Sequence, residues 1–176
     1  MGGCDYQTRL QTDITQNRFS EGDRGVQIIY TPGHWQLLTR EGRKITFYCS
    51  LGQSLTEETQ RVIGHLMGLS EGTRLELSYG VCQKQKGLNC GVHAIAMAVC
   101  FALGHMISEA RFSHELLRGH LVECYEKQNL SEFPKPTEKE KGKIAVTGKE
   151  TRLQIRIPKL CINLFLAVLI QKRRNK

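Results

Sequence analysis

Cys90 is the residue of this chain best placed for nucleophilic chemistry. It lies where the polar segment 83–89 meets an almost wholly apolar segment, 91–103, that is rich in small residues. A helix that is apolar on all sides is buried at the centre of a domain, so Cys90 is expected at the start of such a helix. The free N–H groups and the dipole there favour a thiolate and can hold an oxyanion. The alternative is that Cys90 is a small buried hydrophobic residue.

A thiol nucleophile needs a histidine to take its proton, and His34 is the best candidate for that base. It begins the apolar segment 34–38 and directly precedes Trp35, the only tryptophan of the chain. His93, three residues after Cys90, is an alternative base but is also interpreted as a satisfied core histidine. The other histidines lie on or beside expected helices and are interpreted as surface or packing residues, namely His65, His105, His114 and His120.

Short strands and helices are expected to position these two residues. Period-two patterns and turn residues predict strands over 26–30, 34–38, 44–48 and 73–79. Ser54 and Glu57 have the spacing of a capping box, and the apolar residues that follow share one helical face. The cysteine helix is expected to stop at Gly104, and another amphipathic helix is expected from Phe112 to about Lys127.

The 176 residues fit one folded domain, which we expect over 25–136. Residues 1–24 are polar and are predicted to form a weakly structured arm, and residues 137–176 a basic linker and tail of unknown role. The net charge is +8, but residues 135–176 hold twelve basic and three acidic side chains, so the remainder has a net charge of −1. Contact with nucleic acid is therefore expected at most from the tail, and a solvated extension is the simpler interpretation.

The seven cysteines favour a reducing, intracellular location, in the nucleus or the cytoplasm. Their number is odd and no pair has C-x-x-C spacing, so neither a disulfide framework nor a zinc site is expected. Cys90 and His93 form C-x-x-H, but no second ligand pair follows, and no metal or other cofactor is predicted. The apolar run 160–170 is shorter than the roughly 20 residues needed to cross a bilayer, so no membrane span is expected.

Four short motifs follow one another in an order that resembles the ubiquitin-like protease family of cysteine peptidases. A His34-Trp35 strand comes first, then KITFYCSLG over 44–52, a helix and a strand. Gln85 then precedes Cys90-Gly91 and an alanine-rich helix. The best-known members of this family process and deconjugate SUMO and NEDD8, and the chain looks most similar to divergent members associated with mobile elements in animal genomes. The resemblance covers roughly 26–134.

The resemblance implies an α+β, papain-like cysteine-proteinase fold of the adenoviral-proteinase type, with the Cys90 helix packed on a small mixed sheet. It implies that Cys90 attacks the carbonyl after a diglycine and that His34 moves the proton. Gln85 would donate to the oxyanion, and Trp35 would wall a channel that admits only glycines. The implied partner is a ubiquitin-like modifier or its conjugates, bound by a monomer, with no cofactor.

The sequence departs from the family at two places. Cys49 stands where the family has the aspartate that orients the histidine, and a neutral thiol is a poorer acceptor than a carboxylate. Asn89 stands where an aspartate is expected before Cys90, unless that aspartate is deleted. With a deletion, Gln85 is one residue too close to Cys90; without one, the oxyanion position falls on Lys84. Two functions are therefore expected from the resemblance, an impaired peptidase or isopeptidase and an inactive pseudoprotease that binds a modifier or is a mobile-element remnant.

Overall fold

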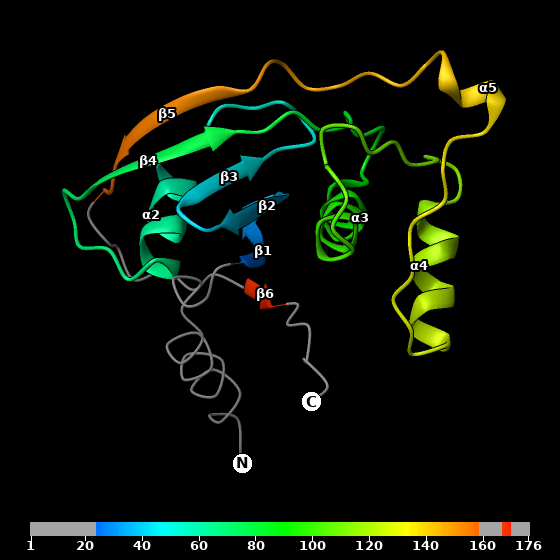
Figure 1. The fold of residues 1–176 in the computed structure, drawn as a ribbon, viewed down its shortest axis with the longest axis horizontal. Helices are drawn as coiled ribbons and strands as arrows, with labels where there is room; N and C mark the ends of the chain where they lie inside the picture. Colours follow the sequence, from blue (N-terminus) through cyan, green and yellow to red (C-terminus); the bar gives the residue numbers. More distant parts are fainter. Residues whose placement is uncertain (1–23, 159–166, 170–176) are drawn as a thin grey trace.

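A mixed β-sheet forms the centre of the molecule in the computed structural model, which describes residues 24–158 and 167–169. Its six strands have the order β5-β4-β3-β2-β1-β6 (Figure 1). The strands are β1 (Arg24–Thr31), β2 (His34–Glu41), β3 (Lys44–Tyr48), β4 (Arg74–Tyr79), β5 (Thr151–Arg156) and β6 (Ala167–Leu169). The helices are α2 (Glu57–Leu66), α3 (Cys90–Ala102), α4 (Leu117–Glu126) and α5 (Glu138–Lys141). The fold class expected from the sequence, α+β, is confirmed.

The first three strands form an antiparallel meander whose turns are set by glycine. Gly33 and Gly42 have φ values of 81° and 56°, which residues with a Cβ atom adopt only at a cost. The tight turn before His34 pairs Tyr30 of β1 with Trp35 of β2. This hairpin therefore fixes the position of the predicted base at the very start of β2.

The chain crosses from β3 to β4 through α2, and these two strands pair in parallel at Thr46–Ser78 and Phe47–Tyr79. Helix α2 starts later than the predicted capping box, because Thr56 is the N-cap residue and its side chain accepts a hydrogen bond from the backbone N–H of Thr59 at 3.2 Å. Ser54 therefore lies before the helix.

Two apolar clusters lie on opposite faces of the sheet, because successive side chains of a strand point to opposite sides. Leu37 packs with the residues of α3, whereas Leu38 packs with those of α2, and both are fully buried. Full burial of one leucine contributes about 1.5–3 kcal/mol. Helix α3 is buried over most of its length, as its uniformly apolar sequence predicts, and Gly104 follows its end with a φ of 89°.

Part of the segment expected to be linker and tail is instead structured. Strand β5 pairs antiparallel with β4 along its whole length, and Figure 1 shows it at the outer edge of the sheet, joined to α5 by a long connection. The short alternation of Leu153 and Ile155 with polar residues is the strand signal, and Ile155 is buried in the α2-side cluster. This strand was not predicted, because the alternating pattern is short and charged residues surround it.

The helix predicted after Phe112 is shorter in the structure than expected. The helix expected over 112–127 is limited to 117–126 and is preceded by turns. The predicted N-terminal arm lies outside the described residues apart from Arg24, and so does the apolar run 160–170 apart from β6. None of the helices in the described part of the chain has the length and apolar character that crossing a membrane requires.

Candidate active site

Cys90 is the first residue of α3, as its sequence context predicts. The first hydrogen bond of this helix runs from the N–H of His93 to the carbonyl of Asn89 at 2.9 Å. The N–H groups of residues 90–92 therefore have no partner within the helix, and they present the positive end of its dipole to the thiol. The Cys90 side chain is partly exposed, so a substrate can reach the sulfur.

The surroundings of Cys90 favour its thiolate. Burial by itself would raise the pKa of this thiol, but the backbone N–H of Trp35, the side chain and charge of His34 and the backbone N–H of Gly91 outweigh it. The pKa of Cys90 therefore lies below the ordinary thiol value. A low pKa at a partly exposed position is the combination found in reactive cysteines.

His34 lies between two thiols. Its Nε2 atom is 3.1 Å from the sulfur of Cys49. Its Nδ1 atom is buried and has no hydrogen-bond partner among the described residues. The ring is close enough to Cys90 to lower the pKa of that thiol, yet the two do not reach full hydrogen-bond geometry. With Nε2 occupied by Cys49, Nδ1 is the ring nitrogen of His34 that has no hydrogen-bond partner among the described residues.

Gln85, the predicted oxyanion donor, is held inside its own loop. Its side-chain N–H donates to the carbonyl of Gly87 at 2.7 Å, and its side-chain oxygen accepts from the hydroxyl of Ser50 at 2.7 Å. The amide must release Gly87 before it can donate to a substrate. Lys84, the alternative position, has an exposed side chain, and its backbone N–H bonds to the carbonyl of Ala145 at 2.8 Å.

Arg118 of α4 fastens the loop that leads into Cys90. Its Nε–H donates to the side-chain oxygen of Asn89, and its Nη2–H donates to the carbonyl of Leu88, both at 2.8 Å. The side-chain N–H of Asn89 donates back to the carbonyl of Lys86 at 3.1 Å. Sequence reasoning assigned Arg118 no role, because no local pattern predicts a contact between residues 29 positions apart.

Trp35 packs on the residue that follows Cys90 in α3. A Cβ atom on Gly91 would come within 3.3 Å of the indole, so the ring packs closely on the first turn of α3. The ring of Tyr30 lies 4.8 Å from that of Trp35, centroid to centroid. Tyr30 was not predicted to lie here, although the two-residue turn between the strands places position 30 opposite position 35.

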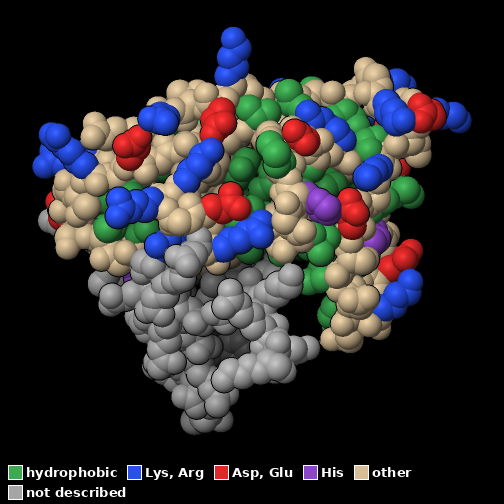
Figure 2. Space-filling model, viewed as in Figure 1, with side chains coloured by type: hydrophobic (Ala, Val, Ile, Leu, Met, Phe, Trp, Pro, Cys, Tyr) green, Lys and Arg blue, Asp and Glu red, His purple; other side chains and the backbone are tan. Residues whose placement is uncertain are grey.

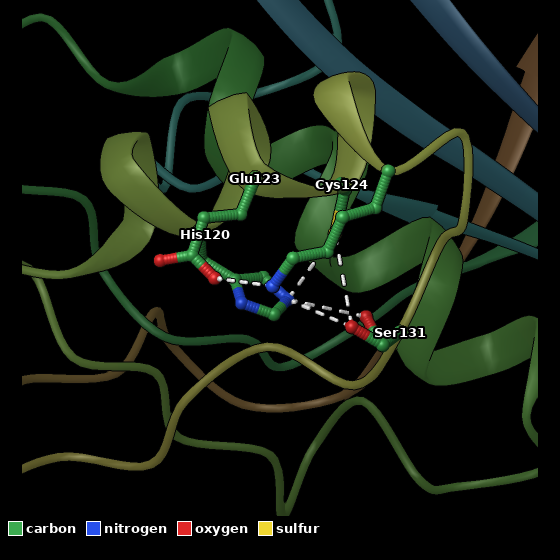
Figure 3. Close-up of polar contacts among 5 residues, drawn as sticks. His120, Glu123, Cys124 and Ser131 are labelled. Atoms are coloured by element: carbon green, nitrogen blue, oxygen red, sulfur yellow. Dashed lines mark hydrogen bonds and ion pairs between the residues drawn. The ribbon is translucent and has the colours of Figure 1, made fainter.

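A second contact between a thiol and an imidazole lies on α4 (Figure 3). The sulfur of Cys124 is 3.4 Å from Nε2 of His120 and 3.7 Å from the hydroxyl of Ser131. Cys124 is buried and lies near the C-terminal end of its helix, where the dipole disfavours an anion. It is a packing residue, as predicted, and so is Cys100, whose pKa burial raises to about 11.

The other sequence candidates fall outside the site. His93 is fully buried in α3, and neither of its ring nitrogens has a hydrogen-bond partner among the described residues, so it is not the satisfied core histidine that was expected. It lies against His114, with ring centroids 5.4 Å apart.

Within the described part of the chain, no three His, Cys, Asp or Glu side chains gather closely enough to hold a metal ion. A cavity of about 620 Å³ is lined by residues such as Ala96, Cys100 and Phe133, and Cys90 is not part of its wall.

The arrangement as a whole can activate a thiol and move its proton. Comparison with protein-family models, with curated proteins and with solved structures yields no match to this chain.

Proposed function

We propose that this protein is a cysteine-type peptidase or isopeptidase that cleaves after the diglycine of a ubiquitin-like modifier, with a papain-like arrangement of helix α3 against the sheet. The position of the His34 ring between Cys49 and Cys90 carries the proposal. A nucleophile at a helix start, a base on the adjoining strand and a third group behind the base form the constellation that thiol catalysis requires.

The reaction begins when Cys90 gives its proton to Nδ1 of His34 and the thiolate attacks the carbonyl carbon of the second glycine. The oxyanion is met by the N–H groups at the start of α3. As the intermediate collapses, the C–N bond breaks and His34 returns the proton to the leaving amine. Water then attacks the thioester, which gives a free carboxylate and restores the thiol of Cys90.

The preference for glycine rests on the close packing around the nucleophile. The indole of Trp35 covers Gly91, and the first turn of α3 has no side chain there to hold it away. A substrate segment that passes Trp35 to reach Cys90 therefore meets an aromatic wall at short distance, and residues without a Cβ atom fit there best.

A modifier that ends in diglycine vinyl sulfone tests this function directly. We expect it to label the intact chain at Cys90, identified by peptide mass spectrometry, and Cys90→Ser to abolish the labelling. Cys124→Ser is the matched control, since it removes the thiol of the second cysteine–histidine contact and should leave labelling unchanged. A folded chain that stays unlabelled by modifiers of several families would contradict the proposal.

A pseudoprotease that binds a modifier without cleaving it is the second candidate, and the hydrogen bonds of Gln85 favour it. The donor is engaged with Gly87, and the group behind His34 is a thiol instead of a carboxylate. Under this alternative the native chain binds the modifier and releases no product. Cys49→Asp combined with an aspartate inserted after Asn89 should then create cleavage, and an inert variant would show that these two departures are not the reason.

A further inference from the structure

Three side chains converge beside the C-terminal end of α4 (Figure 3). Nε2 of His120 lies 3.4 Å from the sulfur of Cys124 and 3.4 Å from both the hydroxyl and the carbonyl oxygen of Ser131. The Cys124 sulfur lies 3.7 Å from the Ser131 hydroxyl. Ordinary N–H···O hydrogen bonds measure about 2.7–3.2 Å, so the nitrogen–oxygen contacts are long. The sulfur, the nitrogen and the oxygen therefore surround a common point.

The backbone brings these groups together in two ways. His120 and Cys124 are four residues apart in α4, so they lie on the same face of the helix. After the helix, Gln128 takes a φ of 50°, and the N–H of Asn129 donates to the carbonyl of Cys124 at 3.0 Å. This turn reverses the chain and returns Ser131 to the side of the helix.

The His120 ring is held in place from its other side. It packs edge-on against the buried ring of Phe133, with centroids 4.7 Å apart. Cys124 is buried, His120 is partly exposed and Ser131 is exposed. The convergence point is therefore shielded on the side of the sulfur and accessible to solvent on the side of the serine.

The spacing of the three side-chain atoms fits one face of a tetrahedron around a small cation. Zinc binds sulfur at about 2.3 Å and nitrogen or oxygen at about 2.0–2.2 Å, which in a tetrahedral site separates sulfur from its nitrogen and oxygen neighbours by roughly 3.6 Å and nitrogen from oxygen by roughly 3.4 Å. The distances from the Cys124 sulfur are 3.4 Å to nitrogen and 3.7 Å to oxygen, and nitrogen and oxygen are 3.4 Å apart. Each agrees within the tolerance of about 0.2 Å that a metal site allows.

We propose that His120, Cys124 and Ser131 form a binding site for a thiophilic divalent cation, with zinc as the ion that these donors favour and water as the fourth ligand. A thiolate and an imidazole select zinc, whereas magnesium and calcium prefer oxygen ligands. The site is separate from Cys90 and His34, so the inference does not depend on the proposed function.

The serine oxygen distinguishes this site from a closed structural zinc site. Only two of its three side chains belong to the types His, Cys, Asp and Glu, three of which nowhere gather in the described residues. A hydroxyl is a weaker ligand than a carboxylate, and the fourth position is open to water. We therefore expect an exchangeable ion, bound more weakly than in a site with four cysteine or histidine ligands.

Binding exchanges one proton for the ion. The Cys124 thiol gives its proton to solvent and its sulfur binds the cation as a thiolate, while His120 binds through the lone pair of Nε2 and keeps its ring proton on Nδ1. The C-terminal end of α4 disfavours the thiolate alone, but the same end of the dipole favours a cation. Because a proton is released, binding should strengthen as the pH rises.

Cobalt(II) is the probe, because its absorption reports sulfur coordination in a tetrahedral site whereas the filled d shell of zinc absorbs no visible light. We expect cobalt added to the reduced, intact chain to produce a sulfur-to-cobalt charge-transfer band, and zinc to displace it. Cys124→Ser should abolish the band. His120→Gln should weaken cobalt binding at least about tenfold, and Ser131→Ala should weaken it less.

Cys100→Ser is the matched control, since it removes another buried helix cysteine and should leave the band unchanged. Cys90→Ser should also leave it unchanged, which separates this site from the candidate active site. Thermal unfolding without metal shows whether the variants fold alike, and His120→Gln changes a partly exposed side chain should Cys124→Ser fail to fold.

Two results would overturn the inference. One is a native chain that gives no charge-transfer band with cobalt. The other is a band that persists in folded Cys124→Ser or binds cobalt as tightly in His120→Gln, including a band that only Cys90→Ser removes, which would place the ion at the candidate active site. Neither result bears on labelling by the diglycine probe, so the two proposals fail separately.

Discussion

The indole of Trp35 lies so close over Gly91 that a Cβ atom on this glycine would be 3.3 Å from the ring. This contact joins the strand that carries His34 to the helix that carries Cys90. The glycine therefore sets how closely the base and the nucleophile approach each other, and the tryptophan reports on that distance.

Gly91→Ala should displace the indole and separate the two catalytic candidates. Trp35 is the only tryptophan, so its fluorescence spectrum reports the displacement without interference. We expect a shifted emission maximum and at least about a tenfold fall in Cys90 labelling, because displacements near 1 Å can cost about 10²-fold. Gly119→Ala in α4 is the control: its Cβ atom would meet nothing within 4 Å, and it should stabilise the helix by up to about 1 kcal/mol. Unchanged emission and labelling in Gly91→Ala would refute the contact.

His34→Gln should raise the pKa of Cys90, because it removes the side-chain contact and the charge that favour the thiolate. A lowered pKa means that alkylation of the native thiol rises with pH earlier than for an ordinary cysteine. In His34→Gln the rise should move to higher pH, and mass spectrometry of the Cys90 peptide measures it. His65→Gln, on the exposed side of α2, should leave the profile where it is. Superposed profiles for His34→Gln and the native chain would show that His34 does not act on Cys90.

His93 should make the protein less stable in acid. Burial, and then the charge of His114, lower its pKa from 6.5 to about 4 in the folded state, so protons bind the unfolded chain more tightly. The free energy of unfolding should therefore fall by about 1.4 kcal/mol for each pH unit from 6.5 down to about 4, and then level off for this group.

His93→Leu removes this dependence and the two ring nitrogens that have no hydrogen-bond partner among the described residues. We expect urea unfolding to show a flatter pH profile and a higher stability at pH 5 than in the native chain. Some acid sensitivity should persist, because burial also lowers the pKa of His114. A profile as steep as the native one would mean that His93 is not the group that titrates.

Arg118→Ala should loosen the loop before Cys90 by removing the bonds to Leu88 and Asn89. We expect faster amide hydrogen exchange over residues 86–89 and a loss of stability of about 1 kcal/mol. Arg118→Lys should restore little, because an ammonium group cannot reproduce the two-pronged contact. Arg152→Ala, at an exposed position of β5, is the control, and equal exchange rates in all variants would count against the role of Arg118.

The distribution of charged side chains on the face drawn in Figure 2 does not indicate a binding partner. On the face drawn in Figure 2, Lys and Arg side chains are interspersed with Asp and Glu side chains. Several of the exposed charged side chains form ion pairs, as Lys44 does with Glu150 at 2.8 Å. Exposed pairs of this kind contribute about 0–1 kcal/mol, so they are weak determinants of stability.

Elements whose patterns are local could be predicted from the amino-acid sequence. Alternation and turn residues located β1 to β4, and the uniformly apolar segment 91–103 predicted a buried helix with Cys90 at its start. Each of these depends on residues close together in the chain, which is why periodicity and turn chemistry were sufficient. The position of His34 at the beginning of a strand followed in the same way.

Which side chains contact one another depends on how the elements pack in three dimensions. The contacts of His34 with Cys49, Asn89 with Arg118 and Tyr79 with Gln53 join different elements, and no local pattern specifies the direction of a hydrogen bond. Strand β5 also became visible only once β4 supplied its partner, since an edge strand derives its stability from pairing across the sheet. The reactive groups can therefore be named from the sequence, whereas the order of donors and acceptors that connects them depends on packing in three dimensions.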